Sequence, residues 1–357
     1  MDRFITASFS IIAFSTFATT DGVYYEKEDW KNLIRIESDG ANHCSGLLSG
    51  NFVLTAAHCV EGESDKLTFT TSTESISKYK NVYIDESFED LGDSSIGNDI
   101  AIIELSEKAD YKSIFYFHDA KEDEFKYKEP VKIFGFGGSG KLSSATMELT
   151  DWRNCDSCNK RGDSLNAAQV NESHTTGGDS GGPWLNQNGE VIAVHKGSTA
   201  VSQSGKIWRE TYSTKISSAS DFILDTINGW HYPTNLTVNG KTDITLQSLH
   251  KTGSEPDLAN AYRVEGDVEI MPSSSCLNGT ITSFSVCELS IKSNGGTGKV
   301  WLSDDEVMVI NKKVKQPTNG DVKEPQSSGS KSGGSVGFGA TLFMLFLIGR
   351  RYMSSTS

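Results

Sequence analysis

Short apolar runs alternate with turn residues over most of the chain, from about residue 19 to residue 230. The runs NFVLTAAH, KLTFTTS, PVKIFGFG and EVIAVH contain many β-branched and aromatic residues and are bounded by Gly, Asn, Asp or Ser. Runs of this length with turn residues between them are typical of strands. The pattern therefore predicts an all-β domain over 19–230.

One segment near the end of this region has a different period. In KISSASDFILDTINGW, the apolar residues Phe222, Ile223 and Ile227 stand at helical spacing, and Gly229 follows as a stop signal. We therefore expect one helix to close the domain.

A second β pattern covers residues 231–314. The runs LTVNGKTDITL, AYRVEGDVEIM, SFSVCELSIK and GKVWLSDDEVMVI are separated by Gly, Asn and Ser turns, which predicts a small β-sandwich. No catalytic constellation is visible there, so a spacer or binding module is favoured over a second enzymatic activity.

The two ends of the chain read as targeting segments. Residues 1–18 form a signal peptide pattern, in which Arg3 precedes a short apolar stretch and Thr16 and Ala18 stand at cleavage positions; a membrane anchor is the disfavoured alternative. The mature chain would then begin near Thr19. Residues 315–335 form a flexible linker rich in Ser, Gly and charge, and residues 336–357 contain an apolar run followed by Arg350 and Arg351.

Composition narrows the class of partner and the compartment. The net charge of −14, without a Lys/Arg stripe, argues against a nucleic-acid partner. The six cysteines fall into three local pairs that fit an oxidising compartment, namely Cys44 with Cys59, Cys155 with Cys158, and Cys276 with Cys287. The pair at 155 and 158 also has the spacing of a redox or metal half-site, but nothing completes it, so a loop disulfide is favoured and no metal is expected.

Three segments carry chemistry: TAAHC at 55–59, NDIAII at 98–103 and GGDSGGP at 177–183. A serine hydroxyl needs an imidazole to take its proton, and the imidazole needs a carboxylate to fix its tautomer. Ser180, His58 and Asp99 supply these three groups. The glycines before Ser180 would let the backbone N–H groups of Gly178 and Ser180 converge on a developing oxyanion, and each such donor is worth about 3–4 kcal/mol.

These segments resemble the signatures of the chymotrypsin-like serine peptidases, in the family's order His, Asp, Ser. The resemblance implies a two-barrel protease domain, a disulfide between Cys44 and Cys59, protein or peptide substrates and no cofactor. Singly, each of the three residues has an ordinary structural explanation; their joint context favours catalysis. The rival interpretation is an inactive protease-like adhesin scaffold, and the intact triad speaks against it.

The N-terminus departs from the family pattern. Thr19-Thr20-Asp21-Gly22 lies about where the family has Ile-Val-Gly-Gly. In the family a new α-amino group pairs with the carboxylate that Asp179 matches here. Cleavage of the signal peptide near Ala18 would then itself generate the active enzyme.

The specificity positions depart from trypsin in particular. His174 stands where trypsin has an aspartate, so the negative charge that would attract a substrate Arg or Lys is missing. The stretches HTTGGDSGGP and VIAVHKG resemble those of glutamyl endopeptidases, which implies that Thr175 and His195 receive an acidic side chain. The alternative, that both residues line a pocket for a neutral side chain, stays open.

The C-terminal tail resembles the GlyGly-type sorting tails of exported Gram-negative bacterial proteins, on the strength of Gly333-Gly334, the apolar run and the two arginines. This implies a secreted or surface-anchored protein that contacts the membrane through its tail before processing. The alternative is a plain C-terminal membrane helix, for which the apolar run is short.

Overall fold

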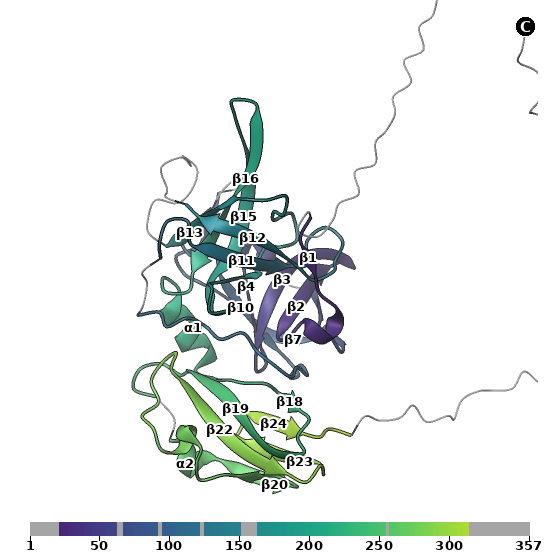
Figure 1. Cartoon of the computed structure of the whole chain (residues 1–357), viewed down its shortest axis with the longest axis vertical. Coiled ribbons are helices and arrows are strands. Elements are labelled where there is room, and N and C mark those ends of the chain that lie inside the picture. The colour runs from purple at the N-terminus through teal and green to yellow at the C-terminus, as the bar shows by residue number, and fades with distance from the viewer. Residues whose placement is uncertain are drawn as a thin grey trace, which may run out of the picture. The chain divides into compact units, whose positions relative to one another are not determined.

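The computed structural model describes residues 21–62, 67–91, 95–121, 125–150, 163–254 and 257–313 (Figure 1). The expected signal peptide, the pair Cys155 and Cys158, and the linker and tail from residue 315 onward lie outside the described residues. Within the described ranges, no helix is long and apolar enough to cross a membrane.

The elements in chain order are almost all strands. The N-terminal region contains β1 (Val23–Tyr24), η1 (Lys27–Asp29), β2 (Leu33–Ser38), β3 (Ala41–Ser49), β4 (Phe52–Thr55), η2 (Ala57–Cys59), β5 (Leu67–Thr70), β6 (Ser75–Ile76), β7 (Tyr79–Ile84), β8 (Glu89–Asp90), β9 (Ser95–Ile96), β10 (Ala101–Leu105), β11 (Pro130–Gly135), β12 (Ser143–Leu149), β13 (Ser164–Gln169), β14 (Pro183–Leu185), β15 (Val191–Gln203), β16 (Lys206–Lys215) and α1 (Ser220–Ile227). The C-terminal region contains β17 (Gly229–His231), β18 (Asn235–Leu236), β19 (Gly240–Leu249), α2 (Leu258–Ala261), β20 (Arg263–Gly266), β21 (Glu269–Ile270), η4 (Ser275–Leu277), β22 (Val286–Ser293), β23 (Gly298–Trp301) and β24 (Val307–Ile310).

The first barrel is a curled seven-stranded sheet in the order β6-β5-β2-β3-β4-β10-β7. Its interior is filled by alternate residues of neighbouring strands, among them Ile34, Ile36, Leu48, Val53 and Ile103, all fully buried. Because successive side chains of a strand point to opposite faces, this alternation buries one face of each strand and fixes the register.

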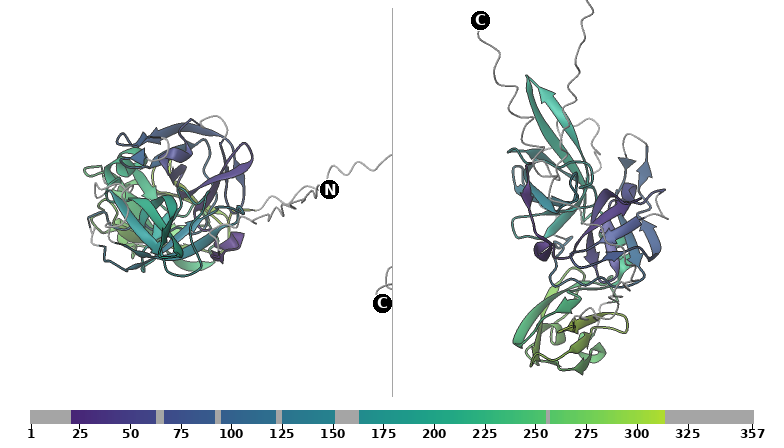
Figure 2. Two further views of the ribbon diagram at one scale, coloured as in Figure 1. Left: turned by 90° about the horizontal axis from the view of Figure 1, so that it is seen from above. Right: turned by 90° about the vertical axis from the view of Figure 1, so that its right-hand side faces the viewer.

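The second barrel closes on itself. Its sheet runs β1-β12-β11-β14-β15-β16-β13, and a further pairing of β12 with β13 joins the ends of its six-stranded part. The core holds Ile133, Met147, Trp184 and Ala193. Strands β15 and β16 are much longer than their neighbours, and Figure 1 and Figure 2 show their hairpin projecting beyond the barrel.

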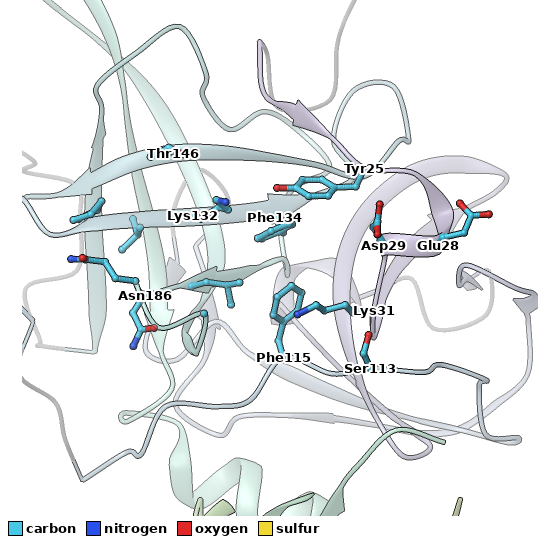
Figure 3. Close-up of a pocket in the computed structure, with 15 residues that line it drawn as sticks. Tyr25, Glu28, Asp29, Lys31, Ser113, Phe115, Lys132, Phe134, Thr146 and Asn186 are labelled. Carbon is cyan, nitrogen blue, oxygen red and sulfur yellow. The ribbon is translucent and has the colours of Figure 1, made fainter. Parts of the chain in front are cut away.

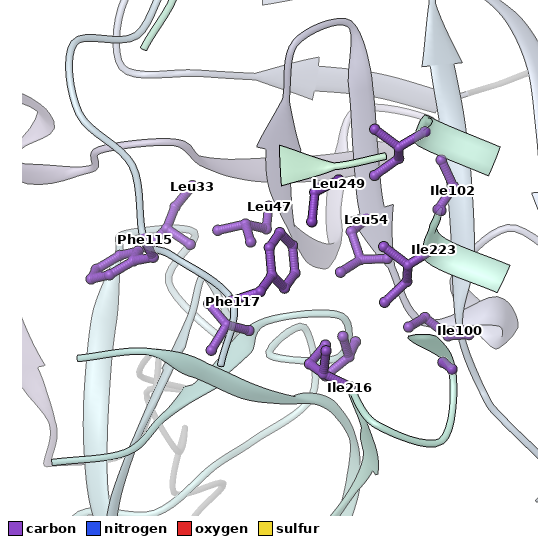
Figure 4. Close-up of a cluster of buried hydrophobic side chains, with 14 of the residues drawn as sticks. Leu33, Leu47, Leu54, Ile100, Ile102, Phe115, Phe117, Ile216, Ile223 and Leu249 are labelled. Atoms are coloured by element: carbon purple, nitrogen blue, oxygen red, sulfur yellow. The ribbon is translucent and has the colours of Figure 1, made fainter. Parts of the chain in front are cut away.

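The expected closing helix is present as α1. Ile223, Leu224 and Ile227 are buried, whereas Phe222 is only partly buried. Asn228, with φ of 39°, takes the left-handed position that ends the helix, one residue before the glycine expected to do so. The buried side chains pack into a cluster shared by both barrels and by Leu249 of β19 (Figure 4).

A β-sandwich follows, with four-stranded sheets β17-β19-β22-β21 and β18-β24-β23-β20. Trp230, Leu246, Leu289 and Ile310 are in its core. Its first sheet already includes Gly229–His231, two residues before the boundary expected from the sequence. The observed architecture is therefore all-β, with two barrels and a small C-terminal sandwich, as predicted.

Buried polar contacts join the sandwich strands to the first barrel and its following segment. His231 Nδ1 lies 2.9 Å from Ser49 Oγ, and its Nε2 lies 2.8 Å from the Phe115 carbonyl oxygen. The Gln247 amide accepts from Phe117 N–H at 2.8 Å and donates to Phe117 O at 2.7 Å. Every polar atom of these two side chains therefore has a protein partner.

Candidate active site

His58 and Asp99 lie at the ends of two paired strands of the first barrel. His58 belongs to η2, which follows β4, and Asp99 stands two residues before β10. Thr55 of β4 pairs with Ala101 of β10, so the two ends lie side by side. Nδ1 of His58 donates to Asp99 Oδ2 at 2.8 Å, and its backbone N–H donates to Oδ1 at 3.0 Å.

This pair leaves one imidazole nitrogen available. Because a carboxylate only accepts, Nδ1 must carry the hydrogen, and Nε2 of His58 is then the nitrogen that can accept a proton. The Asp99 side chain is 1% exposed and that of His58 is 36% exposed. Thr214 Oγ1 donates to the Asp99 carbonyl at 3.3 Å, and the disulfide Cys44–Cys59 ties the residue after His58 to β3.

Ser180 lies in the loop that leads into β14, and Ser45 of β3 holds this loop against the first barrel. The Ser45 N–H donates to Ser180 O at 2.7 Å, and the Ser45 hydroxyl donates to Gly178 O at 2.8 Å. Gly181 has φ of 83°, and a Cβ there would lie 2.1 Å from Thr55 Oγ1. Only glycine therefore fits directly after the candidate nucleophile.

The same loop exposes two backbone donors. Gly178 has φ of 96°, which turns the loop at this position. In the part of the chain that the structure describes, neither the Gly178 nor the Ser180 N–H has a hydrogen-bond acceptor. Both are therefore available to an oxyanion.

The Ser180 hydroxyl lies near the start of an open strand edge. Its Oγ donates to Lys196 O at 3.5 Å, at the limit of a hydrogen bond. No hydrogen bond from this hydroxyl to His58 Nε2 is found among the described residues. Such contacts are often long in a free enzyme and shorten when substrate binds.

Asp179 is a fully buried carboxyl group next to the candidate nucleophile. Oδ1 accepts from Gly137 N–H and Oδ2 from Thr176 N–H, each at 2.8 Å. Burial raises the pKa of Asp179 to about 7, and the two backbone donors only partly offset that increase. A cation delivered to this carboxyl would therefore be strongly stabilising.

His195 is also buried, with 1% of its surface exposed. Its ring stacks on Trp184, whose Nε1–H donates to His195 Nδ1 at 3.3 Å. The hydrogen must therefore be on Nε2. Burial and then the nearby His58 lower the pKa of His195 to about 3, while Asp99 opposes this shift, so the ring is neutral at ordinary pH.

Thr175 reaches the same face of the β15–β16 pair as His195. Its hydroxyl lies 2.9 Å from the hydroxyl of Thr211, and Ser213, two residues along β16, pairs directly with His195. Residues two apart on a strand share a face. His174 is placed differently, because its Nδ1 donates to the Thr175 carbonyl at 3.0 Å, and within the described ranges no hydrogen bond links it to His195.

One group of possible metal ligands is found among the described residues. Cys44, His58 and Cys59 lie within ligating distance of one another, but both sulfur atoms are in the disulfide. A disulfide sulfur is not the thiolate that metals bind. No local motif predicted the contacts of Ser45, Trp184, Thr211 and Thr214, because these contacts arise from strand pairing.

A cavity of about 720 Å³ lies elsewhere in the N-terminal region (Figure 3). Tyr25, Phe115 and Phe134 line it, and Lys31 Nζ lies 4.1 Å from the centroid of the Phe115 ring. None of the candidate catalytic or specificity residues contributes to its wall. We therefore do not assign the peptidase site to this cavity.

A model of the Trypsin family matches residues 20–223, more than half of the chain. The chain belongs to the trypsin family. It is accordingly a serine endopeptidase, and proteins or peptides are its substrates.

Similar solved structures include two proteases from Vibrio cholerae and one from mouse. The trypsin-family chain is 18% identical to the secreted serine protease VesC, with a TM-score of 0.46 over 81% of this chain and 70% of that one. The VesB protease is 17% identical, with a TM-score of 0.46 over 82% and 97%. Mouse neuropsin is 18% identical, with a TM-score of 0.49 over 58% and 99%.

Proposed function

We propose that this endopeptidase works through Ser180, His58 and Asp99, is exported, and prefers an acidic side chain before the cleaved bond. The observation that carries the proposal is the contact of His58 with the buried Asp99, 2.8 Å from Nδ1 to Oδ2, in a chain whose glycine-rich loop presents Ser180. This contact fixes the orientation and tautomer of the imidazole, so that Nε2 can accept the proton of the Ser180 hydroxyl.

The proposed reaction has two stages. His58 takes the Ser180 proton as the hydroxyl attacks the carbonyl carbon, and the Gly178 and Ser180 N–H groups stabilise the oxyanion. The imidazolium then protonates the leaving amine, which leaves an acyl-enzyme. Water activated by His58 hydrolyses this ester and regenerates Ser180. Asp99 remains a carboxylate that holds the ring and stabilises its charged form.

The acidic preference is supported by hydrogen-bond donors on the face of the β15–β16 pair that His195 and Thr175 share. His195 carries its hydrogen on Nε2, because Nδ1 accepts from Trp184. The hydroxyls of Thr175 and Thr211 bond to each other, and one of the two retains a hydrogen that can be donated elsewhere. A site that hydrogen-bonds a substrate group discriminates strongly against substrates that lack it.

Export is supported by the disulfides Cys44–Cys59 and Cys276–Cys287, which persist in oxidising compartments. We propose that residues 1–18 are removed as a signal peptide and that the tail from about Gly334 is removed during sorting at the surface of a Gram-negative bacterium. Intact mass of the surface-derived protein tests this: a mature form that retains Arg350 and Arg351 would favour the plain-anchor alternative.

Activation by signal cleavage is a further part of the proposal. The buried Asp179, with its raised pKa, is suited to receive the α-amino group of a chain that starts near Thr19. A variant with one additional, blocked residue at this end should lose activity. Full activity of the blocked protein would reject the mechanism.

The function is tested with a peptide library and the exported protein. The proposal predicts internal cleavage after Glu in preference to Arg or Lys, abolished by Ser180→Ala. Dominant cleavage after Arg or Lys would reject the acidic preference and leave the nucleophile standing. The absence of any cleavage by correctly folded mature protein would instead favour the inactive adhesin scaffold.

A further inference from the structure

The hairpin β15–β16 has one strand edge that stays open next to the nucleophile. From Val191 to Val194, β15 is paired on one side with β14, and from Ala193 onward it is paired on the other side with β16. At His195 the catalytic loop still occupies the first side, since Gly181 N–H donates to His195 O and His195 N–H donates to Gly182 O, both at 2.8 Å. Beyond this point, no strand among the described residues pairs with that side.

The register shows which residues direct their backbone toward the open side. Ser204 and Gly205, with φ of 53° and 78°, form a two-residue turn, so Gln203 and Lys206 exchange hydrogen bonds. Alternate residues then point away from β16. The backbone N–H and C=O groups of Ser198, Ala200 and Ser202 therefore point toward the open side.

Two independent contacts agree with this register. Arg209, which pairs with Ala200, donates its N–H away from β15, to Gln169 Oε1 at 2.9 Å. His195 also directs both of its backbone groups away from β16, to the loop that carries Ser180. The register shift between His195 and Gly197 then moves the outward-facing set from odd to even positions. The residues of the open edge are partly or fully exposed, with Ala200 and Ser202 in the exposed class. In the part of the chain that the structure describes, the backbone groups of Ser198, Ala200 and Ser202 on this side have no strand partner.

The edge begins at the reacting centre. Lys196 O lies 3.5 Å from Ser180 Oγ, and six residues further along an extended strand span about 20 Å. His58, which protonates the leaving amine, is in the first barrel, whereas the edge leads away from Ser180 along the second. The peptide segment beside the edge is therefore the part before the cleaved bond, and it runs antiparallel to β15.

We propose that the outer part of this edge, at Ala200 and Ser202, extends the bound substrate to at least seven residues before the cleaved bond as an added β-strand. The first residue before the bond lies at Lys196 O, and the third, fifth and seventh pair with Ser198, Ala200 and Ser202. The endopeptidase thus selects extended, unfolded or loosely held segments of protein rather than short peptides. The proposal rests on Ser180 being the nucleophile, as proposed above.

The experiment measures binding, so that it does not depend on turnover. Exported Ser180→Ala protein is titrated with fluorescent peptides that share the residue before the scissile bond and carry three, five, seven or nine residues on that side. We expect the dissociation constant to fall by about tenfold from three to seven residues and to change little beyond eight, because each added pair brings two backbone hydrogen bonds.

N-methylated peptides test the register without altering the protein. Methylation of the fifth or seventh residue should weaken binding about tenfold, and methylation of the fourth or sixth should have an effect below about twofold, because only alternate N–H groups face the edge. In the protein, Ala200→Pro should remove the length dependence, and the matched Ala200→Val, which keeps the N–H, should retain it.

The outcomes that would contradict the strand-addition proposal differ from those that would contradict Ser180 as the nucleophile. Equal binding of three-residue and seven-residue peptides, no measurable binding at any length, or a methylation effect without alternation would overturn the strand-addition proposal. A dimer that Ala200→Pro converts to monomers in sedimentation would assign the edge to a second copy of the chain and also overturn it. Failure of wild-type protein to cleave any peptide would instead reject the nucleophile assignment.

Discussion

Two groups of buried polar residues in this molecule differ in how many of their hydrogen-bonding atoms have protein partners. At the junction with the sandwich, both nitrogens of His231 and the whole amide of Gln247 are occupied by protein partners. At the candidate active site, Asp99 is equally buried, yet the Gly178 and Ser180 N–H groups and His58 Nε2 keep capacity for substrate.

The contrast separates a structural polar group from one suited to catalysis. Burial alone does not distinguish them, because His231 and His195 are both fully buried and burial lowers the pKa of both, to about 4 and about 3. The number of hydrogen-bond partners does distinguish a structural group from a catalytic one. A saturated buried group stabilises one arrangement of the chain, whereas an unsaturated group held in place by saturated neighbours is available for chemistry.

The largest effect is expected at Ser180, the proposed nucleophile. Ser180→Ala or His58→Ala should lower kcat by about 10⁶-fold. Ser180→Ala should leave the thermal midpoint nearly unchanged, because the Ser180 hydroxyl makes only one long hydrogen bond, at 3.5 Å. Ser254→Ala, on the exposed surface of the sandwich, is the matched serine control. A fall in kcat of less than a hundredfold for Ser180→Ala would show that another group acts as nucleophile.

His231→Ala should have the opposite profile. It leaves Ser49 Oγ and the Phe115 carbonyl without their partner, which should lower the free energy of unfolding by ~2–4 kcal/mol. The kcat per correctly folded molecule should stay within about threefold of wild type. Urea unfolding and active-site titration measure the two quantities. Unchanged stability with a lost kcat would invalidate the contrast.

The pH dependence of stability tests Asp179 in the unprocessed chain. Its pKa in the folded chain, about 7, exceeds that in the unfolded chain, so the folded state binds more protons between about pH 4 and pH 7. Unfolding free energy should therefore fall as pH rises through this window, by on the order of 1–3 kcal/mol.

The control for this dependence is Asp179→Asn, which should flatten it. Processing should also reduce it, since an α-ammonium group beside the carboxylate lowers its pKa. An equal slope in the wild-type unprocessed chain and in Asp179→Asn would mean that other groups carry the effect.

The smallest effect concerns substrate choice. His195→Ala should lower the ratio of kcat/KM for Glu over Gln substrates by about tenfold, because the Nε2–H donor is removed. Since the His195 pKa is about 3, the wild-type ratio should not follow histidine protonation between pH 5.5 and 8. Thr175→Ser, which keeps a hydroxyl, is the control. A ratio unaffected by His195→Ala would assign the preference elsewhere.

The sequence predicted the elements whose signals are local. The spacing of Ile223 and Ile227 predicted the closing helix, which the structure contains. The motifs around His58, Asp99 and Ser180 predicted the catalytic roles that are proposed here. It did not predict that Trp184 fixes the His195 tautomer or that Ser45 braces the nucleophile loop. These contacts join strands that are distant in sequence, and they depend on a register that no local pattern specifies.

The length of the β15–β16 hairpin was not predicted either. Its outer part, residues 199–203 and 206–210, lacks the buried face that gives other strands their apolar alternation. Asn228 likewise replaced the expected Gly229 at the end of α1, because asparagine tolerates the left-handed conformation.

The most direct test of the account is covalent labelling of the mature protein with a fluorophosphonate, followed by peptide mapping. The account predicts one adduct per molecule, on Ser180, that is absent in Ser180→Ala and slowed by His58→Ala, while His231→Ala protein that remains folded labels at the wild-type rate. No adduct on folded mature protein, or an adduct on a different serine, would contradict it.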